Sequence, residues 1–210
     1  MLTRQLLDST RGRIVTLLRQ SDRTVDDLAS TLRLTPNAVR AQITAMERDG
    51  VVRRVGRRPG TTRPSHVFEL VPEVEELLSR AYIPLLTHLV QAFANGLPPE
   101  QVTTLLRDAG KGLADELMGK ARRSAGFRSR VAFASHLLNE QLGAVTHVEE
   151  NGAFVIRGAA CPLAALTGKH PAVCLAIESF VSEVVGVPAR ECCEREGRPR
   201  CCFEIPRQKI

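Results

Sequence analysis

The stretch "SDRTVDDLASTLRLTPNAVRAQITAMERDG", residues 21–50, contains two helix starts separated by a short turn. Thr24 precedes two aspartates, and the helix dipole favours acidic residues in a first turn. Thr35 precedes Pro36, which combines a capping hydroxyl with proline at a helical position that needs no N–H donor. The stretch therefore predicts two short helices joined by a tight turn, the second ending at Gly50.

The second of these helices has an apolar and a polar side. Val39, Ile43 and Met46 fall together at about 100° per residue, and polar residues occupy the opposite side. A helix in the major groove reads base edges with its N-terminal residues, and Asn and Arg suit bidentate contacts to adenine and guanine. The residues expected to contact DNA from this helix are Thr35, Asn37, Arg40, Ala41, Thr44 and Arg48.

The segments on either side complete a larger domain. Upstream, apolar residues at helical spacing predict a helix over roughly residues 2–19, with Ser9 as a competent cap. Downstream, "VVRRV" and "HVFEL" read as strands, and the turn-rich "GRRPGTTRPS" between them makes a hairpin. Its Arg57, Arg58 and Arg63 are placed to touch phosphate or the minor groove. Residues 1–71 are thus predicted to form a winged helix-turn-helix DNA-binding domain.

Composition agrees with a polyanionic partner. The 210 residues carry a net charge of +6 and a pI near 9.3, and a basic surface attracts phosphate backbones. No apolar run approaches the ~18 residues of a membrane span, so no membrane association is expected. The first residues, "MLTRQLLDSTRGR", lack the pattern of a secretory signal, which makes the cytoplasm the expected location.

Residues 72–124 are expected to be a helical connector. A broad apolar stripe over residues 73–95 is interrupted by Pro84, which predicts a kink or a split. A second helix should start at Pro98 and run to a basic cluster of Lys120, Arg122 and Arg123. Because helix-turn-helix proteins usually bind DNA as twofold dimers, we expect residues 73–95 to form a homodimer interface. The alternative is an intramolecular helical hairpin packed on the C-terminal part.

Residues 125–210 predict a small α+β sensor domain, which makes the whole chain α+β. A helix is followed by a hairpin with an Asn151-Gly152 turn, a loop that opens with Cys161, and a helix from about Pro171 to Gly186. Cys174 lies in the first turns of that helix, where the dipole should favour its thiolate. The segment "RECCEREGRPRCCFEI", residues 190–205, reads as a terminal hairpin.

The two cysteine doublets of this hairpin have a defined register. An antiparallel pairing sets Cys193 opposite Cys201 and Cys192 opposite Cys202, with one pair on each face of the sheet. Only one pair can therefore join the upstream Cys161 and Cys174. In a reducing compartment, such a group of four thiolates suits a tetrahedral zinc ion or an iron–sulfur cluster.

The stretches "LTPNAVRAQITAMERDG", "GRRPGTTRPSHVFEL", "CPL", "HPAVC" and "CEREGRPRCCFEI" together resemble the SufR-type iron–sulfur regulators, winged-helix repressors related to the ArsR and MarR types. The resemblance implies a homodimer that holds a 4Fe-4S cluster, binds operator DNA according to cluster occupancy and represses iron–sulfur assembly (suf-type) genes. It carries over Cys161, Cys174 and Cys193 as cluster ligands and Cys201 as the fourth. The doublets depart from the family pattern, so Cys192 or Cys202 could substitute.

Two other functions compete with this one. The C-terminal part could be a zinc- or dithiol-based redox switch joined to the same DNA-binding domain. It could also be a small-molecule-binding or catalytic domain, but no Gly-rich phosphate loop and no nucleophile–base–acid set is visible, so we do not expect an enzyme. His88, His136 and His147 are isolated, and lone histidines are seldom metal ligands.

Overall fold

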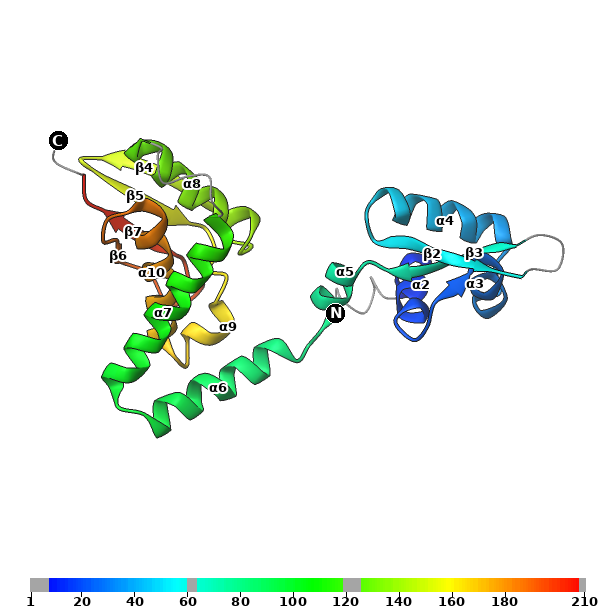
Figure 1. Ribbon diagram of the computed structural model, residues 1–210, viewed down its shortest axis with the longest axis horizontal. Coiled ribbons are helices and arrows are strands. Elements are labelled where there is room, and N and C mark those ends of the chain that lie inside the picture. The colour runs from blue at the N-terminus through cyan, green and yellow to red at the C-terminus, as the bar shows by residue number, and fades with distance from the viewer. Residues whose placement is uncertain (1–7, 60–63, 119–125, 208–210) are drawn as a thin grey trace. The chain divides into compact units, whose positions relative to one another are not determined.

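The computed structural model describes residues 8–59, 64–118 and 126–207 (Figure 1). The chain forms two compact units, Met1–Arg80 and Ala81–Ile210. Three parts of the sequence predictions lie outside the described residues: residues 2–7 of the first helix, Arg63 of the hairpin loop, and the cluster of Lys120, Arg122 and Arg123. In the part of the chain that the structure describes, no helix is both long and apolar enough to cross a bilayer.

The first unit is a winged helix-turn-helix, as the sequence predicts. Its elements in chain order are α2 (Thr10–Leu18), β1 (Arg23–Thr24), α3 (Val25–Leu32), α4 (Pro36–Arg48), β2 (Val52–Arg58), β3 (Ser65–Leu70) and α5 (Pro72–Leu78). The three strands form an antiparallel sheet in the order β1-β3-β2. Apolar residues from all three main helices and from β2 and β3 share one buried core, which includes Ile14, Leu28, Val39, Ile43, Met46 and Phe68.

Side-chain caps fix where these helices begin. Ser9 Oγ accepts a hydrogen bond from the Gly12 amide at 3.0 Å. The Thr24 hydroxyl accepts from the Asp27 amide at 3.2 Å, while the Asp27 carboxylate accepts from the Thr24 amide at 2.8 Å, a reciprocal capping box. Thr35 caps α4, with proline in its first turn. The helix starts expected at Thr24 and Thr35 are therefore confirmed, whereas the helix expected over residues 2–19 is described as α2, which begins only at Thr10 after its Ser9 cap.

The hairpin differs from its prediction in two respects. Strand β2 continues to Arg58, so Arg57 and Arg58 belong to the strand rather than to the loop. The register shifts between Arg54 and Gly56, a bulge that re-aims the residues beyond it. The two-residue strand β1, which sequence patterning did not reveal, pairs with β3 and closes the sheet against α3.

The second unit is an α+β domain. In chain order it contains α6 (Tyr82–Gly96), α7 (Pro99–Met118), α8 (Phe127–Glu140), β4 (Thr146–Asn151), β5 (Ala153–Gly158), α9 (Ala164–Thr167), the 3-10 turn η2 (Pro171–Val173), α10 (Cys174–Val185), β6 (Arg190–Glu191) and β7 (Cys202–Ile205). The strands form an antiparallel sheet in the order β4-β5-β7-β6. Helices α8 and α10 pack on one face of it around a core that includes Val131, Leu138, Ile156, Phe180 and Phe203.

The predicted connector is divided between the two units. Helix α5 belongs to the first unit and ends at Leu78, and α6 and α7 belong to the second. The apolar stripe is thus split in two, as Pro84 suggested, but the interruption lies at residues 79–81. Pro84 itself occupies the first turn of α6, where its missing N–H leaves no helical hydrogen bond unmade.

Helix α7 approaches the backbone of α10 closely at Gly110. A Cβ placed on Gly110 would lie 2.0 Å from the Ala176 carbonyl oxygen and 2.9 Å from Ser179 Cβ. At the same crossing, Ser179 Oγ donates a hydrogen bond to the Arg107 carbonyl at 2.8 Å. The absence of a side chain at position 110 is therefore what allows the two helices to pack at this distance.

We expect Gly110→Ala to lower the free energy of unfolding by about 2–4 kcal/mol, because the added methyl group collides with backbone that cannot move aside alone. Gly112 lies on the same helix with nothing within 4 Å of its added Cβ. Gly112→Ala should therefore raise the free energy by about 0.5–1 kcal/mol through helix propensity. Urea denaturation followed by circular dichroism compares the two, and equal effects would contradict the close packing.

Candidate DNA interface and thiol centre

Helix α4 presents an apolar side to the core and a polar side to solvent. Val39, Ile43 and Met46 are buried in the first unit. The six residues expected to contact DNA from this segment are all exposed: Thr35, Asn37, Arg40, Ala41, Thr44 and Arg48. Arg40 Nη1 donates a hydrogen bond to Asn37 Oδ1 at 3.3 Å, which holds two potential base-reading groups side by side.

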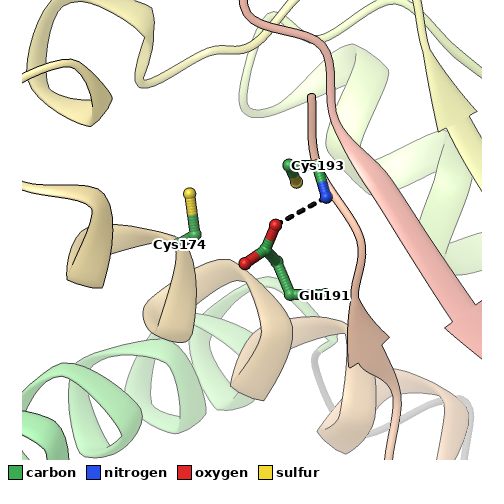
Figure 2. Close-up of side chains that lie close together, drawn as sticks. All are labelled: Cys174, Glu191 and Cys193. Atoms are coloured by element: carbon green, nitrogen blue, oxygen red, sulfur yellow. Dashed lines mark hydrogen bonds between the residues drawn. The ribbon is translucent and has the colours of Figure 1, made fainter. Parts of the chain in front are cut away.

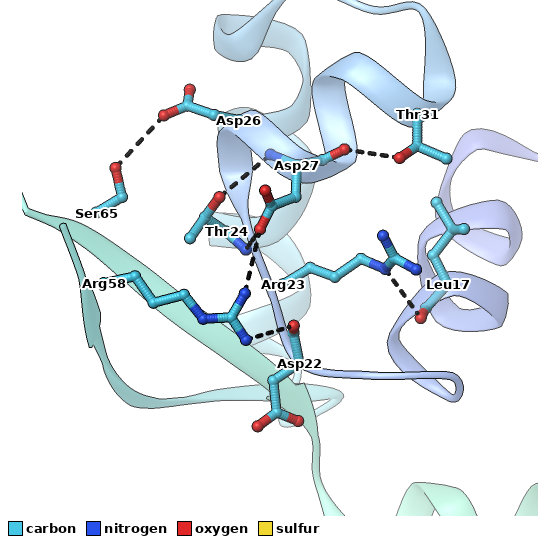
Figure 3. A network of polar contacts seen from close by, with 9 residues as sticks. All are labelled: Leu17, Asp22, Arg23, Thr24, Asp26, Asp27, Thr31, Arg58 and Ser65. Atoms are coloured by element: carbon cyan, nitrogen blue, oxygen red, sulfur yellow. Dashed lines mark hydrogen bonds and ion pairs between the residues drawn. The ribbon is translucent and has the colours of Figure 1, made fainter. Parts of the chain in front are cut away.

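The two arginines at the end of β2 have different surroundings. Arg58 donates a hydrogen bond to the Asp22 carbonyl at 3.1 Å and forms an ion pair with Asp27 at 3.7 Å (Figure 3). Hydrogen bonds from Thr24, aided by the Arg58 charge, hold the pKa of the Asp27 carboxyl below its usual value. Arg57 has no ionic partner among the described residues. The structure thus gives Arg58 a role in fastening the hairpin to α3, while Arg57 remains available to a ligand.

A cleft of about 490 Å³ separates α4 from the hairpin strands. Arg40 and Thr44 line it from the helix, and Arg54 and His66 line it from the strands. Arg54 is paired with Glu47 at 2.8 Å, which compensates its charge. Sequence reasoning did not select Arg54 or His66, because only the packed sheet brings them opposite α4.

The C-terminal hairpin has the register expected for the cysteine doublets. The structure pairs Arg190 with Glu204 and Glu191 with Phe203, and a further bridge joins Glu194 to Arg200. The Cys192 amide donates to the Cys202 carbonyl at 2.8 Å. Cys192 therefore lies opposite Cys202, and the two form a disulfide with their Cα atoms 4.9 Å apart.

The other four cysteines are free thiols, and the structure brings them together. The side chains of neighbouring members interact and shift one another's pKa: Cys161 with Cys201, Cys201 with Cys193, and Cys193 with Cys174. Cys161 lies in the loop after β5 and Cys174 is the first residue of α10, while Cys193 follows β6 and Cys201 immediately precedes β7. Cys174 and Cys201 are buried, and Cys161 and Cys193 are half-buried. We call this group of four the thiol centre.

Hydrogen bonding makes the four thiols unequal. The pKa of Cys161 is lowered because Cys201 donates a hydrogen bond to it, and the same bond raises the pKa of Cys201 to about 12. A hydrogen bond from Cys174 acts to lower the pKa of Cys193, but its bond to Cys201 and burial prevail and raise that pKa to about 12.

Cys174 departs from its sequence prediction. The helix dipole was expected to favour its thiolate, but its hydrogen bond to Cys193 and its burial raise its pKa. Since most of these thiols keep their protons in the absence of a nearby cation, a bound metal would have to displace protons from them.

A carboxylate and a guanidinium adjoin the thiol centre. Glu191 Oε1 accepts a hydrogen bond from the Cys193 amide at 2.6 Å, and the donor atoms of Cys174, Glu191 and Cys193 all lie within 4.8 Å of one another (Figure 2). Arg195 pairs with Glu191, and its positive charge acts to lower the pKa of Cys174. Sequence reasoning missed both residues, although positions 191, 193 and 195 alternate along one extended segment and so share a face.

Comparison with known proteins finds a family similar to part of the first unit. Residues 8–54 match the family model described as "Bacterial regulatory protein, arsR family". No curated protein sequence matches the chain. Among solved structures, a double mutant of ZitR from Lactococcus lactis in its apo form matches with 20% identity over 56% of this chain and 88% of that chain, at a TM-score of 0.28. Together with the observed helix order, the family match identifies residues 8–54 as a helix-turn-helix segment similar to that of arsR-type regulators.

Proposed function

We propose that this protein is a homodimeric, cytoplasmic transcriptional repressor whose binding to operator DNA is controlled by an iron–sulfur cluster on Cys161, Cys174, Cys193 and Cys201. One observation carries the proposal: four free thiols from separate segments meet in a chain that also holds an arsR-type winged helix. The resemblance to SufR-type regulators supports iron–sulfur assembly genes as the targets and 4Fe-4S as the cluster.

The donor set fits such a cluster. Thiolates are soft ligands that suit iron–sulfur clusters and zinc alike, so the spacing of the sulfurs matters. A single zinc ion holds sulfurs at about 2.3 Å, which keeps four of them about 4 Å apart. Among the described residues, the group with all donor atoms within 4.8 Å of one another contains neither Cys161 nor Cys201. The four sulfurs are therefore spread more widely than one zinc ion requires, and this favours the larger cluster.

The surrounding groups are suited to hold a negatively charged centre. When bound, the cluster supplies a site whose charge and integrity respond to oxidants and iron supply. The Cys202 amide donates to Cys193 Sγ at 3.2 Å, which stabilises negative charge on that sulfur. Arg195 offsets the charge near Cys174. Glu191 is held in place, because its own amide donates to the Glu178 carboxylate at 2.8 Å.

Packing links the thiol centre to helix α6. Cys174 is the first residue of α10, and the preceding Val173 is buried against Val90 of α6 and Leu166 of α9. A change in the position of Cys174 on loss of the cluster would therefore be transmitted directly to α6. Such a coupling needs one element with two arrangements, and the α10 N-terminus is that element in this proposal.

The exposed side of α6 supports the dimer. Val90 faces the domain interior, while large apolar side chains on the helix are between 41% and 59% exposed: Tyr82, Ile83, Leu85, Leu86, Leu89 and Phe93. Monomeric proteins rarely expose a contiguous apolar surface of this kind. The intramolecular hairpin considered from the sequence leaves these residues uncovered, so a second copy of the chain, meeting α6 across a twofold axis, is the occupant we propose.

One observation favours the zinc alternative. Cys174, Glu191 and Cys193 have donor atoms close enough for a single ion, and such a site could control the same winged helix. Metal content distinguishes the two functions.

Anaerobically purified protein should be brown and contain about four irons and four sulfides per chain. Cys174→Ser and Cys193→Ser should lose the visible absorption, because each removes a thiolate from the centre. Cys192→Ser removes a sulfur atom on the other face of the hairpin, outside the thiol centre, and should retain the iron. Colourless protein with one zinc ion per chain would replace the cluster proposal with the zinc alternative.

Leu86→Glu combined with Leu89→Glu should convert a dimer to a monomer at micromolar concentration, because two carboxylates would be desolvated in the interface. Light scattering coupled to size-exclusion chromatography measures the mass. Val145→Glu, a change at an exposed valine outside α6, is the matched control and should leave the dimer intact. A monomeric wild-type chain would remove this part of the proposal.

Arg40→Ala should weaken operator binding and relax the preference at one base position, by about 1–3 kcal/mol for a bidentate contact. Arg57→Ala should weaken binding evenly across sequences and reduce the salt dependence by about one counterion per protomer. Arg58→Ala should also lower the free energy of unfolding by about 1 kcal/mol, since it removes the contacts to Asp22 and Asp27. Fluorescence anisotropy across a salt series, with thermal unfolding alongside, separates the three effects.

A further inference from the structure

A second sulfur site lies on the opposite face of the C-terminal sheet. The register pairs His147 with Arg157 and Arg157 with Cys202, and Cys192 is opposite Cys202 on the last strand. These four residues therefore form one row across the sheet, on a single face. The thiol centre uses Cys193 and Cys201 on the other face, so the disulfide between Cys192 and Cys202 takes no part in it.

A cavity of about 400 Å³ adjoins this disulfide. Its lining includes the row residues His147, Arg157 and Cys202, the hairpin residues Glu194, Arg198 and Arg200, and Cys201 of the thiol centre. Cys202 is buried from bulk solvent but borders the cavity, whereas Cys192 is half-buried and does not line it. Of the two disulfide-bonded cysteines, Cys202 is therefore the one that a molecule in the cavity would contact.

The charge of the lining selects for an anion. Three arginines face one glutamate within the cavity. Arg157 is compensated by Glu149 at 3.1 Å, and Arg200 lies 3.9 Å from Glu194, the limit of an ion pair. Arg198 is exposed and has no ionic partner among the described residues. Guanidinium groups bind carboxylates through paired hydrogen bonds, so a carboxylate-bearing ligand fits.

We propose that this cavity binds a small anionic thiol, which reduces the disulfide between Cys192 and Cys202 by thiol–disulfide exchange. The ligand's thiolate sulfur forms a bond to Cys202 Sγ as the disulfide breaks, and the electron pair leaves on Cys192 Sγ, which solvent can reach. A second thiolate attacks the ligand sulfur of this mixed disulfide and releases Cys202 as a thiolate. Two ligand thiols are oxidised to one disulfide while the protein disulfide gains two electrons.

The thiol–disulfide exchange would let the domain respond to the concentration of thiol, independently of metal binding at the thiol centre. The amide of Cys202 is the donor to Cys193 Sγ, so the two sulfur sites share a residue of backbone. Opening the disulfide would loosen the cross-strand link beside the thiol centre. The proposal does not depend on which metal the centre holds or on whether it holds one.

Air-oxidised full-length protein is first tested for the bond itself. Thiol titration after denaturation should find four free thiols of the six, and peptide mapping should join Cys192 to Cys202. Six free thiols after oxidation, or a bond between other cysteines, would overturn the proposal. Cys192→Ser protein treated with glutathione disulfide should carry glutathione on Cys202.

The rate of disulfide reduction then tests the cavity. Glutathione, which carries a net negative charge, is compared with the neutral 2-mercaptoethanol. The ratio of their second-order rate constants should fall by about fivefold in Arg198→Gln combined with Arg200→Gln, because the attraction for the anionic thiol is lost. Arg190→Gln removes an exposed arginine of the same hairpin that does not line the cavity, and should leave the ratio unchanged.

Comparing the two thiols within each variant cancels general effects on the disulfide. The single Arg198→Gln variant removes a side chain with no ionic partner in the described structure, so it guards against loss of folding in the double variant. An unchanged ratio in both Arg198 variants, or an equal fall in the Arg190 control, would show that the cavity does not select the anion.

Discussion

The antiparallel register between β6 and β7 places two pairs of sulfur atoms on opposite faces of one sheet. Because side chains alternate along a strand, each doublet sends one cysteine inward and one outward. The inward pair, Cys193 and Cys201, meets Cys161 and Cys174, and the outward pair forms a disulfide. A shift of the register by one residue would exchange the faces and dismantle the thiol centre. The site therefore depends on backbone pairing as much as on its thiols.

Helix α10 connects this centre to the rest of its domain. Its first residue is a member of the centre, its middle packs against α7 at a glycine, and the residue before it is buried against α6. Interiors packed at this density transmit displacement and do not absorb it. The exposed apolar side of α6 thus lies one helix contact away from the sulfur atoms, and this short path is the physical basis of the coupling that we propose between metal occupancy and dimer geometry.

In the first unit, some arginines of β2 form ion pairs within the domain, and another is left to bind a ligand. Arg54 and Arg58 are committed to Glu47 and to Asp22 and Asp27, whereas Arg57 is left without an ionic partner in the described residues. From the sequence alone, these arginines look like equivalent members of one basic hairpin. Their separate roles follow from the third strand, β1, which pairs with β3, and from the position of Asp22 and Asp27 within reach of the Arg58 side chain.

The sequence alone predicted the features that depend on residues close together in the chain. These are the caps at Ser9, Thr24 and Thr35, the polar side of α4, the Asn-Gly hairpin and the register of the cysteine doublets. Tertiary structure decided what depends on distant partners. The raised pKa of Cys174 arises from Cys193 and burial, which outweigh a favourable helix end. Glu191 and Arg195 lie beside the centre, and Arg58 pairs with Asp27, only because packing brings these residues together. A local sequence pattern does not encode a partner from a distant segment of the fold.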